Sequence, residues 1–243
     1  MLEPRLSQPE LLAHDLQQRG YAVLDAPSVC AAAGCQLSDL LAWAPDWKGL
    51  PPDAFLKDGG RYRRRRHSCF VVQGQQLVQT AHRTHWQPLA YNALHGGLQR
   101  LFEPMSPALV AQPTWSQLLI WLAGLASQLK GEQPWYVEAH QFRIDTTDGI
   151  GRPTPEGAHR DGVDLVAVFL VERHAVKGGE TRVFEANGPQ GQRFTLSQPW
   201  SVLLLDDERV VHETTPIQPL TEMGYRDSLV VTLRRGGFQA QEA

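Results

Sequence analysis

The second half of this chain alternates short apolar segments with turns, and this alternation limits the possible folds more than any other feature. Candidate strands follow one another at 136–145, 163–171, 181–184, 201–205, 210–213 and 226–233. Segments rich in glycine, proline and asparagine separate them, at 149–157, 178–179, 187–191 and 216–224. Many short strands with little helix between them are typical of a double-sheet antiparallel barrel, so the pattern predicts a jelly-roll.

The first half of the chain mixes helix and strand signals. Capping-box patterns, in which Ser or Thr is followed three residues later by Glu or Gln, predict helix starts at Ser7 and Thr114. Glycines that can end a helix follow at Gly20 and Gly131. A short strand at 21–24 and a helix at 38–44 are also expected.

No linker-like segment separates the two halves, so we expect a single domain over 1–243. Residues 1–134 would supply helices and strands that support a barrel formed by residues 135–235. The expected class is therefore α+β, mainly β, with a helical N-terminal part packed on a jelly-roll core.

Composition excludes several classes of protein. A formal net charge of −3 gives no general attraction to nucleic acid or acidic membranes, so neither is expected as a partner. The three cysteines have no metal-type spacing, which argues against a disulfide framework or zinc module. The start of the chain lacks a signal-peptide pattern, and the apolar stretch 118–129 is short and interrupted. These features favour a cytoplasmic protein.

A run of basic residues at 61–67 could suggest RNA binding, but it lacks an RNA-binding fold signature. If the run is extended, its arginines point to both faces. We therefore expect a solvated edge strand, with one arginine reaching a pocket.

The most informative polar residues begin with His159 and Asp161, which flank Arg160 at the end of a Gly/Pro-rich loop. On an extended strand alternate side chains share a face, so the imidazole and the carboxylate would lie side by side. A His-x-Asp pattern alone is a weak signal.

A second histidine, His212, lies on a later strand. Two histidines and one carboxylate form the facial triad of non-haem Fe(II) oxygenases, which leaves coordination positions open for a 2-oxo acid and O2. A zinc hydrolase could use the same three residues to activate water, and that alternative stays open at this point.

An arginine after the second histidine indicates which of these chemistries applies. Arg226 and Ser228 share one face of the strand 226–233. The planar guanidinium donates two parallel hydrogen bonds to a carboxylate, so Arg226, with Ser228, would suit the distal carboxylate of a chelated dicarboxylic acid. Arg234, at the other end of that strand, ranks second.

These motifs together resemble a bacterial family of Fe(II)/2-oxoglutarate dioxygenases, which includes free L-isoleucine hydroxylases and the biofilm, stress and motility protein A branch. The resemblance is carried by 155–162, 178–181, His212 and 224–229, and it spans about 138–233. It implies a double-stranded β-helix of the cupin-like kind. It also implies Fe(II) held by His159, Asp161 and His212, with 2-oxoglutarate anchored by Arg226.

Other polar residues are candidates for contacts around such a centre. Gln141 and Arg143 share one face of the strand before the metal loop and could bind a substrate carboxylate, although alternation does not say which face is inside. Glu156, Arg160 and Thr181 could orient the ligands. The remaining histidines lack partners at ligand spacing and are expected to be structural; they are His14, His67, His82, His85, His95, His140 and His174.

The sequence thus predicts an Fe(II)- and 2-oxoglutarate-dependent dioxygenase that hydroxylates a small molecule, in particular a free aliphatic L-amino acid. Fe(II) would be the metal, 2-oxoglutarate and O2 the cosubstrates, and ascorbate a stimulant. Besides a zinc hydrolase, the alternative is a non-catalytic stress or biofilm protein that keeps the fold as a binding module. The sequence leaves open the carbon attacked, the oligomeric state and the metal present after purification.

Overall fold

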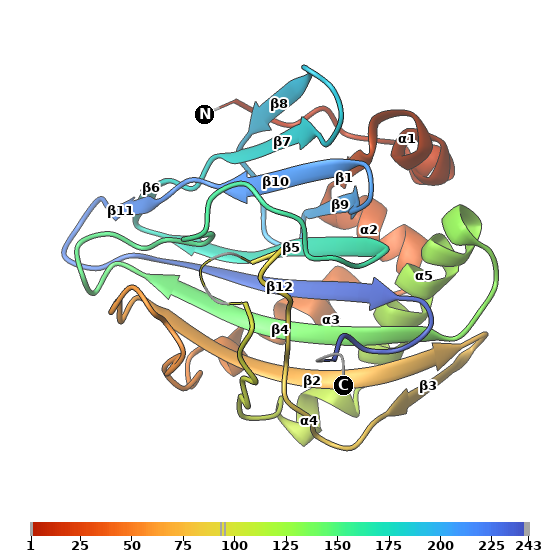
Figure 1. The fold of residues 1–243 in the computed structure, drawn as a ribbon, viewed down its shortest axis with the longest axis horizontal. Helices are drawn as coiled ribbons and strands as arrows, with labels where there is room; N and C mark the ends of the chain where they lie inside the picture. The colour runs from red at the N-terminus through yellow and green to blue at the C-terminus, as the bar shows by residue number, and fades with distance from the viewer. Residues whose placement is uncertain (1, 93, 95, 241–243) are drawn as a thin grey trace.

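The computed structural model describes residues 2–92, 94 and 96–240. Its largest element is a seven-stranded antiparallel sheet (Figure 1). In spatial order its strands are β1 (Tyr21–Leu24), β9 (Val202–Asp206), β5 (Leu165–His174), β12 (Tyr225–Arg234), β4 (Trp135–Asp145), β2 (Arg63–Gln73) and β3 (Gln76–Gln79). Apart from the β2–β3 hairpin, neighbours in this order are far apart in the sequence, so the sheet forms only when both halves of the chain meet.

Two smaller sheets form a second layer over one end of the large sheet. One contains β10 (Val210–Thr214), β7 (Thr181–Glu185) and β8 (Gly191–Phe194), and the other pairs β11 (Ile217–Pro219) with β6 (Val176–Gly178). Val183, Phe194 and Val210 of the second layer pack against Val166 and Leu203 of the large sheet. Two antiparallel sheets joined by this core form the expected jelly-roll.

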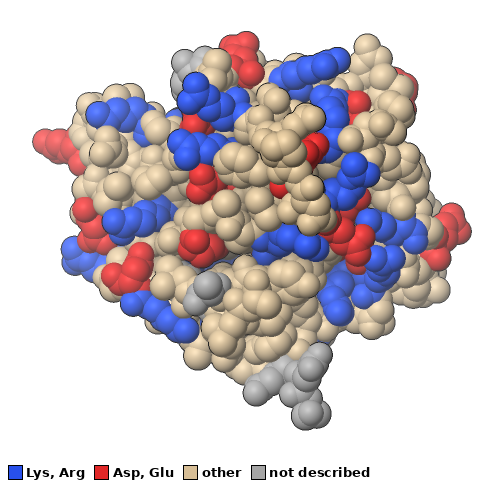
Figure 2. All heavy atoms as spheres, turned by 45° about the horizontal axis from the view of Figure 1, so that its top comes forward, with Lys and Arg blue, Asp and Glu red and all other residues tan. Residues whose placement is uncertain are grey.

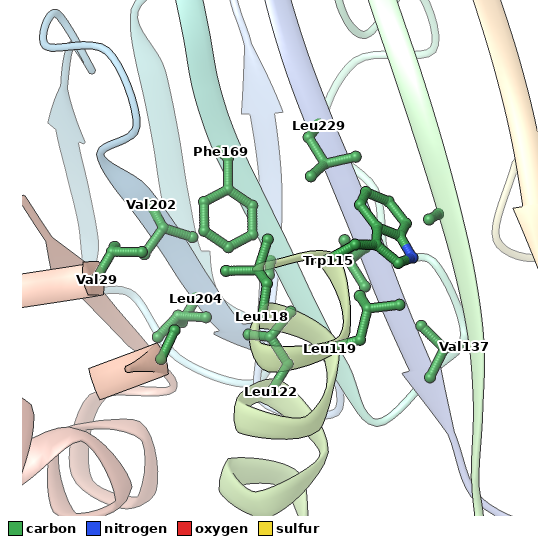
Figure 3. Close-up of a cluster of buried hydrophobic side chains, with 14 of the residues drawn as sticks. Val29, Trp115, Leu118, Leu119, Leu122, Val137, Phe169, Val202, Leu204 and Leu229 are labelled. Atoms are coloured by element: carbon green, nitrogen blue, oxygen red, sulfur yellow. The ribbon is translucent and has the colours of Figure 1, made fainter. Parts of the chain in front are cut away.

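Helices cover the opposite face of the large sheet (Figure 1). They are α1 (Leu12–Arg19), α2 (Ala26–Ala33), α3 (Leu37–Leu41), α4 (Pro107–Val110) and α5 (Pro113–Lys130), with 3-10 turns η1 (Pro9–Leu11) and η2 (Ala44–Trp47). Trp115, Leu118 and Leu122 of α5 point at the sheet beside Phe169 and Leu229 (Figure 3). Burial of this apolar stripe fixes the helices to the sheet.

The expected helices occur, but both capping boxes were wrong. Gln8 and Gln112 occupy the N-cap positions, and neither makes a side-chain capping bond. Thr114 lies inside the first turn of α5 and donates to Asp39. A proline opens η1, which leads into α1, and another opens α5; proline suits this position because no backbone donor is needed there. Gly20 and Gly131 cap the helix ends as expected.

The expectation that the basic run 61–67 forms an edge strand was also wrong. Its residues from Arg63 onward open β2, which pairs with β4 on one side. On the other side the segment 51–53 bonds to the backbone of Arg63 and Arg65. The run is therefore an inner part of the sheet in which alternate arginines face opposite ways.

The charged surface shows no large area of one sign on the face in Figure 2, where acidic and basic side chains are interspersed. Among the described residues, no helix has the length and apolar character needed to cross a membrane.

Candidate metal centre

The His-x-Asp segment lies in the loop between β4 and β5, where it is held against β10. His159 and His212 form an isolated antiparallel bridge, in which each backbone N–H donates to the other's carbonyl, at 3.0 and 2.9 Å. The backbone therefore places the two imidazoles side by side, with ring centroids 4.6 Å apart.

Asp161 completes the group, as the sequence predicted. One carboxylate oxygen lies 4.0 Å from His159 Nε2 and the other 3.9 Å from His212 Nε2. The three donor atoms lie within 4.8 Å of one another. A cation bonded at about 2.0–2.2 Å to each atom would draw them closer together by a small movement.

Hydrogen bonding shows which ring atoms are available to a metal. His159 Nδ1 lies 2.9 Å from the carbonyl oxygen of Gly157, which can only accept, so Nδ1 carries a proton and Nε2 is the atom that faces the site. Burial opposes a charge on His159, but the carboxylates of Asp161 and Glu156 outweigh it and raise the pKa of this ring, so they would equally favour a metal cation at Nε2. Burial and the neighbouring His159 hold the pKa of His212 well below its usual range, so that ring is neutral. Two imidazoles and a carboxylate fit a divalent iron centre.

Asp207, to which the sequence analysis gave no role, holds the metal loop in place. It accepts hydrogen bonds from the backbone N–H groups of Asp161, Gly162 and Val163, at 3.0, 2.7 and 3.1 Å. Gly162 has a φ of +76°, and a Cβ there would meet the Tyr91 ring at 2.4 Å. The fully buried carboxylate thus fixes the segment that presents Asp161.

Gln87, on a long loop of the N-terminal half, orients the carboxylate ligand itself. Its Nε2 donates to Asp161 Oδ1 at 3.1 Å. The sequence offered no signal for this contact, because 74 residues separate the two positions.

Arg226 and Ser228 lie where the sequence placed them, on the cavity face of β12, in a cavity of about 130 Å³ that also contains the three candidate ligands. Arg226 is 3% exposed, and its buried Nε has no hydrogen-bond partner among the described residues. Burial and the nearby Arg173 lower its pKa to about 10. Arg234 also lines the cavity, but it donates to the carbonyl oxygen of Gly237 at 2.7 Å.

The sequence analysis allowed Gln141 and Arg143 to face the site, but both side chains lie on the other face of β4. The cavity is lined by Phe142 and Ile144, whereas the alternate β4 positions point to the helix side of the sheet. Arg143 donates two hydrogen bonds to the buried Asp227, at 2.8 and 2.6 Å, and stacks on Tyr225. The anion that a buried Arg143 requires is thus an internal aspartate, and the expectation of a substrate carboxylate is corrected.

The three expected supporting residues occupy different places. Glu156 lines the cavity, 3.5 Å from His159 Nε2, and its Oε2 is buried with no partner among the described residues. Arg160 points toward the Tyr91 ring, away from the cavity. Thr181 opens β7 opposite Thr214 and does not line the cavity.

A second polar group was missed entirely. His67, His85, Glu138 and His140 are all buried, with donor atoms within 4.8 Å of one another. The register of β2 on β4 creates this group by placing His67 opposite His140. These three histidines were expected to lack partners, and that expectation is corrected; His95 lies outside the described residues.

Arg65 and Glu138 make this second group less suited to a metal than the first. Arg65 Nη2 lies 2.7 Å from His140 Nδ1, and a guanidinium can only donate, so the neutral ring carries its proton on Nε2. The Nδ1 of His85 donates to Glu138 at 2.6 Å. The ring nitrogens that His85 and His140 direct at Glu138 therefore carry protons and are not free to bind a metal.

Fold and site together define a jelly-roll protein with a two-histidine, one-carboxylate metal centre. Residues 44–232 match the family described as 2OG-Fe dioxygenase. The chain therefore belongs to the 2OG-Fe dioxygenase family, whose enzymes use Fe(II), 2-oxoglutarate and O2. This membership favours the dioxygenase over the zinc hydrolase and the non-catalytic binding protein.

Solved structures share this fold. The crystal structure of a bsmA homolog from Methylobium petroleophilum PM1 is 51% identical, with a TM-score of 0.93, and the match covers 99% of this chain and 98% of that one. IDO from Bacillus thuringiensis is 17% identical, with a TM-score of 0.76 and coverage of 98% and 100%. The Fe(II)/(alpha)ketoglutarate-dependent dioxygenase TqaL is 18% identical, with a TM-score of 0.72 and coverage of 96% and 90%. The comparison with curated proteins found no match.

Proposed function

We propose that this chain is a hydroxylase of a free aliphatic L-amino acid, with His159, Asp161 and His212 as the Fe(II) ligands. Arg226, assisted by Ser228, binds the distal carboxylate of 2-oxoglutarate. The family supplies the reaction class, and the residue roles and the substrate are our inference.

The state of Arg226 is the observation that carries the proposal. A buried guanidinium is costly unless an anion meets it. Arg226 shares its cavity with the candidate ligands, and its buried Nε has no hydrogen-bond partner among the described residues. A zinc hydrolase needs no such anchor, whereas a 2-oxo dicarboxylic acid that chelates a metal has a second carboxylate to place.

The residues around the centre would bind and orient the reactants. Asp207 and Gln87 hold the metal loop and the Asp161 carboxylate, and residues of the large sheet and of β10 line the cavity around them. Bound Fe(II) supplies the oxidative chemistry, in which 2-oxoglutarate and O2 are consumed, succinate and CO2 form, and the substrate gains a hydroxyl group.

The cavity lining supports a small substrate that has both apolar and charged parts. Phe142, Ile144, Val168 and Val230 offer apolar surface, while Glu156 offers a carboxylate near the candidate ligands. A free aliphatic amino acid combines an apolar side chain with an ammonium and a carboxylate group. The resemblance to amino-acid hydroxylases points to the same class.

The test is a screen of the twenty common L-amino acids with the purified chain, Fe(II), ascorbate and 2-oxoglutarate. We expect one or more aliphatic members to raise succinate formation above the rate without substrate and to gain the mass of one oxygen atom. The Asp161→Ala variant serves as the inactive control. If succinate forms but no amino acid is oxidised or accelerates it, the substrate class is wrong and the oxygenase assignment stands.

A further inference from the structure

Besides Arg226 and Arg234 of β12, three arginines line the same cavity, on the wall formed by β2 and the loop before α4. Arg63, Arg65 and Arg100 have exposed fractions of 6%, 4% and 2%, so each guanidinium is almost completely removed from solvent. Buried arginines normally meet carboxylates or other acceptors at all their donor positions. Here the acceptors are too few.

Arg63 is the best paired of the three. Its Nε donates to Asp53 Oδ2 at 2.8 Å, and the Asp53 side chain is fully buried. Its Nη2, however, is buried with no hydrogen-bond partner in the described part of the chain. This nitrogen therefore has an N–H group that no acceptor satisfies.

Arg65 lies next along the same face of β2. Its guanidinium stacks on the rings of Phe102 and Phe142, with distances of 3.8 and 4.5 Å to the ring centroids. Nη2 contacts His140, and Nη1 is 3.8 Å from the Asp53 carboxylate. Its Nε is buried and, among the residues described, has no acceptor.

Arg100 has a neutral partner only. Its Nη2 donates to Gln87 Oε1 at 3.0 Å, and its buried Nε finds no acceptor in the described ranges. Burial and the neighbouring Arg63 lower its pKa to about 10. Gln87 in turn donates to Asp161, so one amide group separates Arg100 from a candidate metal ligand.

Acceptors around these guanidinium groups are fewer than their donors. Asp53 accepts from Arg63, Glu138 accepts from His85 at 2.6 Å, and Glu156, which lines the same cavity, lies 3.5 Å from His159 Nε2. Burial keeps the pKa values of His67 and His85 low, so these two rings are neutral. Each of the three arginines thus keeps a buried N–H without an acceptor among the described residues, and a ligand carboxylate would supply acceptors.

These arginines start from a different part of the sheet than Arg226. Arg63 and Arg226 both pair with Ile144, from opposite sides of β4. Their strands are therefore two strand spacings apart, about 10 Å at the usual 4.7–4.9 Å per strand. Side chains that enter the cavity from two such strands can serve two separate anion positions.

We propose that Arg63, Arg65 and Arg100 form a carboxylate subsite that binds the acidic group of the primary substrate, while Arg226 takes 2-oxoglutarate. The identity of that substrate rests on the proposed function, but the subsite itself does not depend on turnover. The proposal gives arginines of the N-terminal half, on β2 and on the loop before α4, the role in binding a substrate carboxylate that was expected of Arg143.

The test uses metal-free protein and two probes of nearly the same shape, 4-methylpentanoate and its neutral amide, 4-methylpentanamide. Calorimetry or ligand-observed NMR gives the dissociation constant of each. We expect the acid to bind and the amide to bind at least about tenfold more weakly, because only the acid forms charge-assisted hydrogen bonds. Leaving out the metal prevents the acid from binding there instead.

Variants then locate the bound acid. Arg100→Gln is the main variant, since Arg100 has a neutral partner and its removal leaves no carboxylate unpaired; we expect acid affinity to fall about ten- to a hundredfold. The double variant Asp53→Asn/Arg63→Met removes both members of the buried pair and should act in the same direction. Arg66→Gln is the matched control, because Arg66 lies on β2 but points away and contacts Glu103. It should bind as the wild type does.

Arg226→Met separates the two anion positions, and its acid affinity should remain within a few fold of the wild type. The proposal is overturned if the wild type binds acid and amide equally, or if Arg100→Gln and the double variant keep wild-type acid affinity. Loss of acid binding only in Arg226→Met would likewise assign the carboxylate to Arg226. None of these outcomes depends on hydroxylation, so failure of the amino-acid screen would leave the result interpretable.

Discussion

Replacing Arg226 by methionine should change protein stability and ligand affinity in opposite directions. Arg226 is 3% exposed, and burial together with Arg173 lowers its pKa to about 10. The folded pKa lies below the unfolded one, so the charged side chain opposes folding at neutral pH. At 1.36 kcal/mol per pH unit, this opposition is on the order of 3 kcal/mol.

Methionine has a similar length and no charge, so Arg226→Met removes this cost without leaving a large cavity. We expect metal-free protein to gain up to about 3 kcal/mol of unfolding free energy, or several degrees in Tm at about 2–4 °C per kcal/mol. Affinity for 2-oxoglutarate should fall instead, because its distal carboxylate would then be buried without a partner. That loss is about 3–5 kcal/mol, roughly a hundredfold or more in Kd.

Urea titration of the metal-free protein measures the first effect, and calorimetric titration of zinc-loaded protein with 2-oxoglutarate measures the second. Arg234→Met is the matched control, since Arg234 lines the same cavity from the same strand but has a backbone acceptor in Gly237. It should lose little 2-oxoglutarate affinity. The reasoning is refuted if Arg226→Met lowers stability by more than 1 kcal/mol while its Kd stays within twofold of the wild type, or if Arg234→Met alone loses the cosubstrate.

Three further variants test the surrounding structure. Asp161→Ala should abolish high-affinity iron binding, measured by metal analysis after dialysis, and retained stoichiometric iron would exclude Asp161 as a ligand. Asp207→Asn weakens the hydrogen bonds that hold residues 161–163, so metal affinity should fall about 10- to 100-fold in a competition assay with a chelator; unchanged affinity would mean that the loop holds its shape without this charge. Arg143→Met leaves the buried Asp227 without its partner and should cost about 3–5 kcal/mol of stability in urea. Since Arg143 lies outside the cavity, the variant should still couple 2-oxoglutarate turnover to hydroxylation below its Tm, and selective uncoupling would restore Arg143 as a substrate contact.

The sequence predicted the barrel and the three candidate ligands because both depend on local patterns. Strand alternation is visible residue by residue, and the spacing within 159–161 sets two side chains on one face. His212 could be found because it follows a strongly apolar strand. These signals need no knowledge of which strand pairs with which.

The rest of the site depends on register and on long-range contacts. Alternation divides β4 into two faces but does not say which one meets the helices, so Arg143 was placed wrongly. The group around Glu138 exists only because β2 pairs with β4 and the loop at His85 folds over them. Gln87 and Asp207 reach the metal loop from 74 and 46 positions away in the chain, and their residue types alone do not show this.

The arginine tract of β2 makes this strand intolerant of changes in length. Arg63 and Arg65 serve the cavity, while Arg64 and Arg66 pair with Asp145 and Glu103 outside it. Inserting or deleting one residue within the strand would keep the tract's composition almost unchanged but exchange its two faces, and His67 would leave the cavity side with them. During divergence, such length changes should therefore be absent from β2, and substitutions at 63–67 should preserve odd and even positions as two separately selected sets.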